Sequence, residues 1–345
     1  MRRLIRVVAC GVCAGVLLSG CTSGDSDNSS RNTATGVPVG AAATAETFEE
    51  VVRDVLPSIA QINTAGGLGS GVVYDDDGHI VTNAHVVGAE TTFTVTFATG
   101  GNPVTASLVA TYQPDDLAVI KVDGDLPVEP ASFGDSGDLA VGELVLAMGS
   151  PLGLSASVTN GIVSALGRTV TEPATTTAPA TTIADMIQTS AAINPGNSGG
   201  ALVDMDKEVI GIPTLAATDE ELGGAAPGIG FAISSDTVKR IVDQIVRDGR
   251  VTDSGRAALD IVVRTVADGE SNLIGVGVVE TIQGGAAADA GIQAGDVITK
   301  INDTDTPTVT KLNEVLASLS PGDEVTVTFR RGGDTETVRV TLGQR

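Results

Sequence analysis

The sequence predicts a mainly β protein with two folded domains, and three observations lead to this prediction. A chain of 345 residues is long enough for two domains. Short segments rich in Val, Ile and Thr recur between residues 58 and 212, separated by Gly, Asp and Asn, which is typical of β-barrels and β-sandwiches. Hydrophobic residues make up 42% of the chain and aromatic residues only 2%, so the cores must consist of Val, Ile, Leu and Ala.

The N-terminus has the pattern of an export signal. Arginines lie within the first six residues, and the apolar run Ile5–Leu18 is too short to cross a membrane as an ordinary helix. The run ends in Leu18-Ser19-Gly20-Cys21, which resembles the cleavage site of bacterial lipoproteins. This resemblance implies a signal peptide over residues 1–20, acylation of Cys21 and stable anchoring to the outer face of the bacterial cell membrane. Ordinary secretion with an unmodified Cys21 is the alternative.

Composition and charge argue against several classes of function. The formal net charge of −23 argues against nucleic acid or an anionic membrane surface as a partner. Cys10 and Cys13 would leave with the signal peptide, so the mature chain would have neither a disulfide nor a cysteine nucleophile. Two histidines, His79 and His85, and no available cysteine argue against a transition-metal site, and we expect no metal and no cofactor.

The first folded domain is expected over residues 46–250. Apolar residues at helical spacing predict a helix that begins at Glu46 and stops at Pro57. Residues 172–182 are rich in Thr, Ala and Pro and are interpreted as an exposed loop, and the amphipathic segment 235–248 predicts a closing helix. The strands predicted between these helices are 58–63, 69–74, 79–82, 93–97, 117–122, 144–148, 157–164, 183–188 and 208–212.

A second, smaller domain is expected over residues 257–345. Residues 21–45 are polar and small and predict a flexible tether before the first domain, and residues 251–256 form a short polar linker after it. The size of the second domain is close to the minimum for independent folding. It is expected to be α+β, with strands at 260–266, 273–279, 296–301, 324–330 and 335–341 and helices at 285–290 and 309–319.

Ser198 lies in a turn of small residues, Asn194-Pro-Gly-Asn-Ser-Gly-Gly200. Its glycines permit backbone conformations that residues with a Cβ resist. Such a turn can aim two N–H groups at one point beside the serine hydroxyl, as an oxyanion hole requires. A surface turn that happens to contain a serine is the alternative interpretation of this stretch alone.

A serine nucleophile needs a base, and His85 is the better placed of the two histidines, where a predicted strand turns into a helical turn. Asp116 directly precedes an apolar strand and is the candidate for the acid that orients the imidazole. We expect Asp115 to point the other way into solvent and His79 to be a solvated residue at a strand end. The chain order His85, Asp116, Ser198 is that of the chymotrypsin class.

Several motifs around these residues resemble those of the HtrA (DegP-like) serine proteases. The catalytic signatures are Thr82-Asn-Ala-His-Val-Val87, Asp116-Leu-Ala-Val119 and Asn194-Pro-Gly-Asn-Ser-Gly-Gly200, and Met148–Gly153, Val158–Ser164 and Gly228–Ile233 are supporting matches. The resemblance extends from Glu46 to the C-terminus. It implies a chymotrypsin-like double β-barrel followed by a small α+β PDZ domain.

The resemblance also implies roles for the residues of the turn. Ser198 would be the nucleophile, His85 the general base and then acid, and Asp116 the orienting carboxylate. The N–H groups of Gly196 and Ser198 would form the oxyanion hole, with Asn197 shaping the turn.

A substrate pocket follows from the same resemblance. Thr214 would donate a hydrogen bond to the catalytic aspartate, and Leu215 and Ala216 would line the first specificity pocket. Ala192 lies six residues before Ser198, at the position that forms the base of this pocket in chymotrypsin-like proteases. A neutral methyl there cannot pair a Lys or Arg head group, so we expect cleavage after small or medium aliphatic residues.

The motif Gly285–Asn302 resembles a PDZ domain of the same family. Such domains add a peptide C-terminus to a strand edge and capture its carboxylate with backbone N–H groups. The capturing loop would include Leu259, Asp260 and Ile261, with Leu312 and Leu316 facing the groove. Asp260 departs from the usual glycine, and its charge is expected to repel an incoming carboxylate.

The first function hypothesis is a membrane-tethered serine endopeptidase that acts on unfolded or damaged exported proteins. The second is a PDZ-based chaperone or stress sensor with a latent protease domain. The third, an esterase, would require a strand–elbow–helix around the serine, whereas Ser198 follows a proline-containing turn. The family commonly forms trimers through N-terminal aromatic residues, and Phe48 is the aromatic residue available here, so the resemblance allows a homotrimer.

Overall fold

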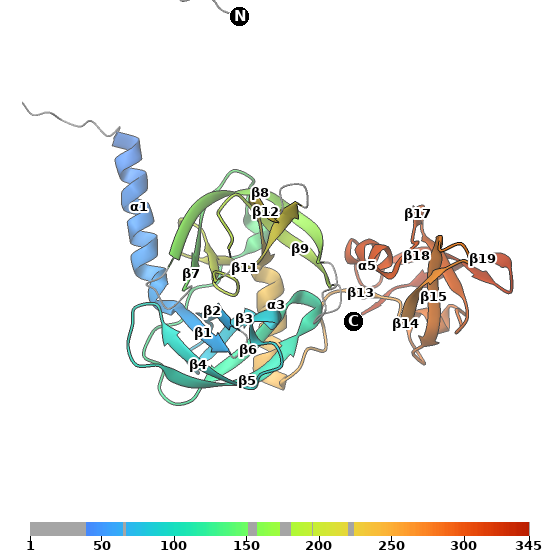
Figure 1. Cartoon of the computed structure of the whole chain (residues 1–345), viewed down its shortest axis with the longest axis horizontal. Coiled ribbons are helices and arrows are strands. Elements are labelled where there is room, and N and C mark those ends of the chain that lie inside the picture. The colour runs from blue at the N-terminus through green and yellow to red at the C-terminus, as the bar shows by residue number, and fades with distance from the viewer. Residues whose placement is uncertain are drawn as a thin grey trace, which may run out of the picture. The chain divides into compact units, whose positions relative to one another are not determined.

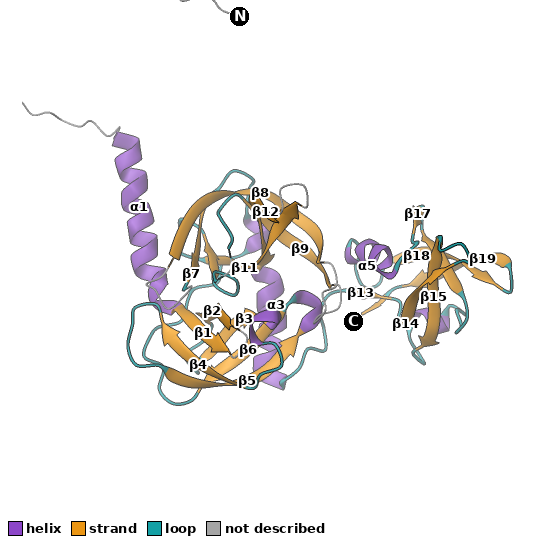
Figure 2. Ribbon diagram, in the orientation of Figure 1, coloured by secondary structure: helices purple, strands orange, loops and turns teal. Residues whose placement is uncertain are grey.

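The computed structural model contains two closed β-barrels followed by a smaller domain built on a six-stranded sheet (Figure 1, Figure 2). The predicted mainly β architecture, a double barrel and then a small α+β domain, is confirmed. The structure describes residues 39–64, 67–150, 157–172, 181–194, 196–219 and 224–344.

The strands of the first barrel follow each other in the order β1-β2-β3-β6-β5-β4. Its interior shows the alternation expected of strands with one buried face, since Phe93, Val95 and Phe97 of β4 are buried and Thr92 and Thr94 are exposed. The strands are β1 (Ile59–Thr64), β2 (Gly67–Val73), β3 (His79–Asn83), β4 (Thr92–Phe97), β5 (Val104–Tyr112) and β6 (Leu117–Val122).

The second barrel has the strand order β10-β11-β12-β9-β8-β7. One apolar core joins it to the first barrel, because Leu117 of β6 packs in the same buried cluster as Leu146, Met186 and Ile212. The strands are β7 (Leu144–Gly149), β8 (Ser157–Glu172), β9 (Thr181–Thr189), β10 (Ala201–Val203), β11 (Val209–Asp219) and β12 (Gly224–Ser234).

Helix α3 (Ser235–Asp248) packs on this shared core through one apolar face. The helix buries Val238, Ile241, Val242 and Ile245, which recur at the spacing of one helix face. It ends at Gly249, whose φ of 68° is the left-handed conformation common at helix C-termini.

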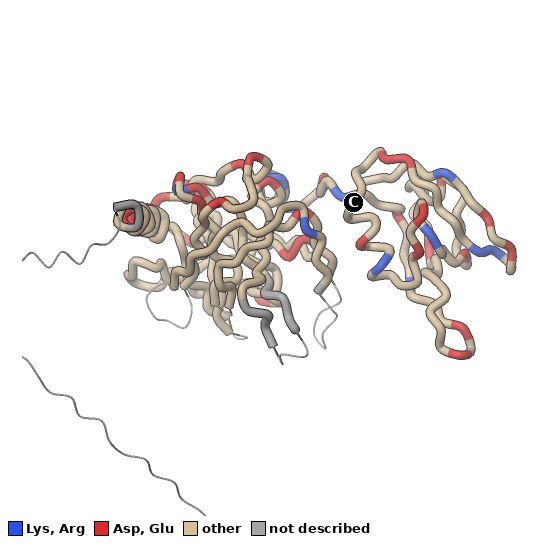
Figure 3. The backbone as a smooth tube through the Cα atoms, turned by 90° about the horizontal axis from the view of Figure 1, so that it is seen from above, with Lys and Arg blue, Asp and Glu red and all other residues tan. Residues whose placement is uncertain are grey.

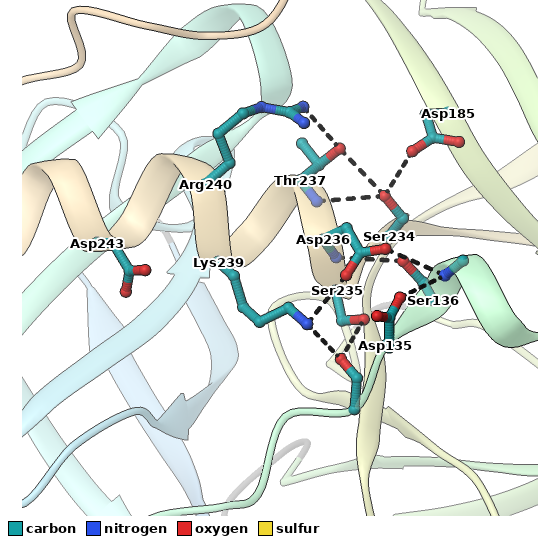
Figure 4. Close-up of polar contacts among 12 residues, drawn as sticks. Asp135, Ser136, Asp185, Ser234, Ser235, Asp236, Thr237, Lys239, Arg240 and Asp243 are labelled. Carbon is teal, nitrogen blue, oxygen red and sulfur yellow. Dashed lines mark hydrogen bonds and ion pairs between the residues drawn. The ribbon is translucent and has the colours of Figure 1, made fainter.

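Polar contacts fix the start of α3 to the second barrel (Figure 4). The N-cap hydroxyl of Ser234 accepts from Thr237 N and donates to Asp185 Oδ2 at 3.0 Å. Lys239 Nζ lies 2.9 Å from Asp236 Oδ1 and donates to Gly134 O at 2.8 Å. Burial pulls the pKa of Asp236 upward, but the contact with Lys239 and the hydrogen bonds with Ser136 and Asp135 together outweigh it and hold that pKa below its ordinary value.

The second domain buries its own core, which includes Phe329, Ile298, Val276 and Leu312. Its sheet runs in the order β14-β15-β16-β18-β19, with β17 paired to β16, and β13 pairs with β20. The strands are β13 (Ala257–Ala258), β14 (Ile261–Ala267), β15 (Leu273–Thr281), β16 (Val297–Ile301), β17 (Thr304–Asp305), β18 (Glu324–Arg331), β19 (Asp334–Thr341) and β20 (Gly343–Gln344), and the helices are α4 (Ala286–Asp289) and α5 (Val309–Ala317).

The N-terminal helix differs from the prediction. Helix α1 runs over Val39–Val55 and therefore begins inside the segment expected to be a tether. Alanines and Glu46 in this stretch favour helix, which the compositional argument for a tether did not take into account. The short helix η1 (Leu56–Ser58), which contains Pro57, follows it. The predicted signal peptide, Cys21 and most of the tether lie outside the described residues.

Acidic residues dominate the surface charge. The chain has 43 Asp and Glu against 20 Lys and Arg. Figure 3 shows the acidic positions spread along the described backbone rather than gathered on one element. Such a distribution favours solubility and gives no single basic surface for a polyanion.

Asp296, directly before β16, forms an ion pair with Arg331 in the second domain. The side chain of Asp296 is 2% exposed and that of Arg331 is 34% exposed. Arg331 donates to both carboxylate oxygens at 2.8 and 2.7 Å. Gln293 N donates to the same carboxylate at 2.8 Å. Burial raises the pKa of Asp296, but these hydrogen bonds outweigh it, so the pKa lies below its ordinary value of 3.8.

We expect Asp296→Asn to destabilise the second domain by about 2 kcal/mol at pH 7, because it removes a charge-assisted bidentate contact. Urea unfolding, with hydrogen exchange of the β16 and β18 amides to localise the effect, measures this. Because the pKa of Asp296 is lower in the folded protein, its ionised carboxylate stabilises the fold above pH 3.8. This contribution is lost as the pH falls through the folded-state pKa, so the unfolding free energies of the wild type and Asp296→Asn should converge there.

Glu324→Gln is the matched control, because its ion pair with Arg339 at 3.2 Å is exposed on both sides and should contribute little. A stability difference between Asp296→Asn and the wild type that stays constant from pH 7 to pH 3 would contradict this account.

Candidate active site

His85 and Asp116 meet at the edge of the first barrel. Helix α2 (Ala84–Val87) follows β3 directly and carries His85. His85 Nδ1 lies 2.7 Å from Asp116 Oδ2, and His85 N donates to Oδ1 at 2.9 Å. An ionised carboxylate only accepts, so Nδ1 carries the proton and Nε2 is the basic nitrogen. The side chain of His85 is 45% exposed and that of Asp116 is 7% exposed, so the imidazole is accessible from solvent while the carboxylate is shielded.

Asp116 is held by contacts on its backbone and on its side chain. It ends the short helix η2 (Gln113–Asp115) with φ 51°, a left-handed conformation that aspartate tolerates better than most residues. Its carbonyl accepts from Ala84 N at 3.0 Å and Asn83 Nδ2 at 3.1 Å. The hydroxyl of Thr214 donates a short hydrogen bond to Asp116 Oδ2. Thr214 therefore reaches from β11 of the second barrel to the acid of the first, as the resemblance implies.

Ser198 lies in the predicted turn, between β9 and β10. Its hydroxyl donates to Thr214 O at 3.3 Å, and Gly199 N donates to Pro213 O at 2.9 Å, so the turn is fixed to β11. Gly199 has φ 81°, and a Cβ there would collide with Ser70 O and Thr82 Oγ1. The glycine is required both by its conformation and by this close approach.

Asn197 shapes the turn from inside. Its side chain is 4% exposed, accepts from Asn194 N at 2.9 Å and donates to Ala192 O at 3.1 Å. Gly196, the other proposed oxyanion donor, has φ 111°, which favours glycine. The Asn197 side chain is thus tied to Ala192 and Asn194 directly before the serine.

Comparisons with known proteins identify two domains and the family of this chain. A family model of the trypsin-like peptidase domain matches residues 69–212, and a model of the PDZ domain matches residues 228–342. The serine protease PepD of Mycobacterium tuberculosis is 38% identical over 90% of this chain and 71% of its own length. The serine protease Do-like HtrA of Lactococcus lactis is 39% identical over 80% of this chain and 70% of its own.

The chain belongs to the HtrA-type serine proteases. It is a serine endopeptidase of this family. A solved structure described as the HtrA-type protease AlgW with tripeptide aligns with a TM-score of 0.58 and 31% identity, over 86% of this chain and 97% of that one. A DegP-like relative from Halomonas elongata, named as periplasmic, is 37% identical over 80% of this chain and 56% of its own length.

Two expectations about neighbouring residues of this HtrA-type protease are wrong. Asp115 is not solvated but 3% exposed, and it pairs with Arg256 at 2.8 Å. It lies in η2 rather than on a strand, so the strand alternation that predicted its direction does not apply. His79 is 6% exposed and not solvated, because its Nδ1 contacts Asp75 Oδ2 at 2.7 Å.

The expected substrate pocket is only partly described. Ala192 is exposed, and its carbonyl accepts from Asn197 and from Thr159 Oγ1 at 3.0 Å. The backbones of Leu215 and Ala216 belong to β11, where they pair with β12, but their side chains lie outside the description. The assignment of Ala192, Leu215 and Ala216 to the pocket stays a prediction.

The five residues predicted for the PDZ groove lie together. They line one groove of about 460 Å³ between β14 and α5. The carboxylate of Asp260 accepts from Ala286 N at 3.2 Å, at the start of α4. Asp260 has φ 56°, the left-handed conformation that a glycine would supply at this position. The groove residues are Leu259, Asp260, Ile261, Leu312 and Leu316.

One residue near the site was missed by the sequence argument. Ser70 of β2 is fully buried, and its hydroxyl donates to Gly196 O at 2.5 Å, although the two residues are 126 positions apart. The motif Gly69-Ser-Gly71 was interpreted only as part of a strand. Within the described residues, no group of three or more His, Cys, Asp and Glu side chains is placed to hold a metal ion.

We expect Thr214→Val to lower kcat by about 10- to 100-fold, the effect of losing one hydrogen bond to a charged group. Asp116 would lose the donor that fixes Oδ2, while the volume of the side chain is kept. Steady-state kinetics on a peptide substrate measures this. Thr214→Ser keeps the hydroxyl and is the control, with kcat expected close to that of the wild type. Equal activity of the valine and serine variants would show that this hydrogen bond does not support the reaction.

Proposed function

We propose that this protein is a membrane-anchored HtrA-type endopeptidase that hydrolyses unfolded or damaged exported proteins through an acyl-enzyme. The observation that carries the proposal is the contact of His85 Nδ1 with Asp116 Oδ2 at 2.7 Å. Thr214 donates to the same carboxylate oxygen, and its carbonyl accepts from the Ser198 hydroxyl. A base, its orienting acid and a serine in a glycine turn are the parts that acyl transfer requires.

In the proposed reaction, Ser198 Oγ attacks the carbonyl carbon of the scissile peptide bond. In the structure the hydroxyl donates to Thr214 O, so it must rotate until its proton can pass to His85 Nε2. Asp116 stabilises the imidazolium that results. His85 then gives the proton to the leaving amine, and water hydrolyses the acyl-enzyme by the reverse sequence of proton transfers.

The negative charge on the carbonyl oxygen would be held by the N–H groups of Gly196 and Ser198. The proposal is supported by the hydrogen bonds that tie the Asn197 side chain, between these two residues, to Asn194 and Ala192. A missing donor of this kind typically costs about 100- to 1000-fold in turnover.

Extended polypeptides fit both parts of the molecule as substrates or ligands. The groove beside β14 would take a peptide C-terminus as an added strand, with Leu312 and Leu316 contacting its apolar side chains. A peptide-bound structure of a similar protease, AlgW with tripeptide, agrees with a role for peptide ligands. A homotrimer assembled near Phe48 remains part of the proposal.

We place the protein on the outer face of the bacterial cell membrane, attached through a lipidated Cys21. The basic, apolar and small-residue order of residues 1–21 supports this. In the described part of the chain, no helix combines the length and apolarity needed to cross a membrane.

A chaperone or stress sensor with a latent protease domain is the second candidate. The groove of the second domain favours it, because that groove would bind peptides without any chemistry at Ser198.

The first test compares the wild type with Ser198→Ala on a reduced, carboxymethylated protein substrate. We expect the wild type to degrade the substrate, and the variant to lose nearly all of this activity because it has no nucleophile, by about 10⁴-fold or more. Gel and mass-spectrometric analysis of the products measures it. Identical behaviour of the two proteins would favour the chaperone or sensor.

The second test concerns specificity. Ala192, at the predicted base of the pocket, is exposed and offers no charge to a basic side chain. A peptide-library digest should therefore show cleavage after small or medium aliphatic residues. Preferred cleavage after Lys or Arg would refute the assignment.

A further inference from the structure

Ser70 of the first barrel forms hydrogen bonds with the turn of the second barrel that contains Gly196 and Ser198. It belongs to β2 of the first barrel and is 0% exposed. Its backbone N–H donates to Ser198 O at 2.9 Å, and its hydroxyl donates to Gly196 O at 2.5 Å. The same hydroxyl accepts from Ser150 N at 2.8 Å, and the Ser70 carbonyl accepts from Thr82 Oγ1 at 2.6 Å. Every polar atom of Ser70 is therefore engaged with the turn or with the strands beside it.

We propose that Ser70 is a positioning residue of the oxyanion hole: its hydroxyl fixes the Gly196–Asn197 peptide and thereby aims the two backbone donors of the turn. This inference rests on the proposed function, since it assigns a supporting residue to the same reaction. Ser70 touches neither the substrate nor the reacting atoms, and it acts through the backbone of the turn.

The Ser70 hydroxyl makes a hydrogen bond to Gly196 O that the backbone of β2 does not make. Any residue except proline at position 70 can donate its N–H to Ser198 O, but the bond to Gly196 O requires a side-chain donor. Gly196 has φ 111° and no Cβ, so steric restraints on its two peptide planes are weak. Two hydrogen bonds from Ser70, on the carbonyls of Gly196 and Ser198, therefore hold the peptides on either side of the Ser198 N–H and the peptide that directly follows the Gly196 N–H.

Close packing around Ser70 restricts the movement of its side chain. A Cβ at Gly69 would run into Val86, and one at Gly71 would come within 2.5 Å of Ile80. On the facing side, a Cβ at Gly149 would lie 3.0 Å from Ser70 Oγ. Strand β2 and its neighbours thus approach more closely at these glycines than any residue with a Cβ would permit. This close packing leaves the Ser70 hydroxyl little freedom to move.

Loss of the hydroxyl should affect the transition state more than substrate binding. The oxyanion exists only after attack on the carbonyl, so misaimed donors lower kcat and leave KM nearly unchanged. A displacement of about 1 Å in a catalytic group can cost about 100-fold in rate. For Ser70→Ala we expect kcat to fall about 10- to 100-fold, with KM within about twofold of the wild type.

The experiment compares Ser70→Ala in the full chain with the wild type and with Ser235→Ala. Ser235 is also 0% exposed and donates its hydroxyl to a backbone carbonyl, Gly134 O at 3.0 Å, but it lies in α3 away from the turn. Each protein is assayed for kcat and KM on a peptide substrate and for inhibition by a matching peptide aldehyde, whose bound hemiacetal oxygen needs the oxyanion donors. The melting temperature is recorded for all three.

The inference requires that kcat and aldehyde affinity fall together in Ser70→Ala, by about 10-fold or more, while Ser235→Ala keeps both. Equal kcat and aldehyde affinity in the two alanine variants would overturn it, as would a loss confined to KM. If Ser70→Ala does not fold, Ser70→Cys replaces it, and the weak thiol donor should give the same selective loss to a smaller extent. A wild type without peptidase activity would refute the proposed function itself, which separates the two failures.

Discussion

The active site depends on hydrogen bonds that pass from one barrel to the other. His85 and Asp116 belong to the first barrel, whereas Ser198 and Thr214 belong to the second. The shared apolar core holds the barrels together, but apolar packing has little directional preference. The contacts of Thr214 with Asp116 and of Ser70 with Ser198 are directional and buried, so they determine how the proposed acid and the proposed nucleophile lie relative to each other.

The sequence predicted the parts of the site that a local pattern marks. His85 follows a strand, Asp116 precedes one, and Ser198 lies among glycines, so each could be found from its immediate neighbours. Ser70 could not be found in this way, because its partner Gly196 is 126 positions away and the neighbours of Ser70 give no sign of this contact. Asp115 was misplaced because a 3-10 turn, rather than a strand, presents it. The register between distant strands is a tertiary property that local patterns do not contain.

The fold was predicted where hydrophobic periodicity is strong. The amphipathic helix α3 has the predicted bounds, and the strands of the barrels appear where β-branched residues alternate with turn residues. Strand β10 has only three residues, and β5 carries Ala and Ser between its apolar positions, so neither gave a clear signal. Both strands form because neighbours on each side supply hydrogen bonds to them, as β7 and β11 do for β10.

Asp260 shows how a charge that departs from the family pattern can be accommodated. Its left-handed φ of 56° gives the loop the backbone conformation expected of glycine, and its carboxylate accepts from Ala286 N. Two glycines make room for it, since a Cβ at Gly285 or Gly343 would collide with the Asp260 side chain. The charge is thus turned toward the start of α4 and partly compensated there, which weakens the repulsion predicted for a peptide carboxylate. A peptide bound as proposed would then be selected mainly by its apolar contacts along β14 and α5.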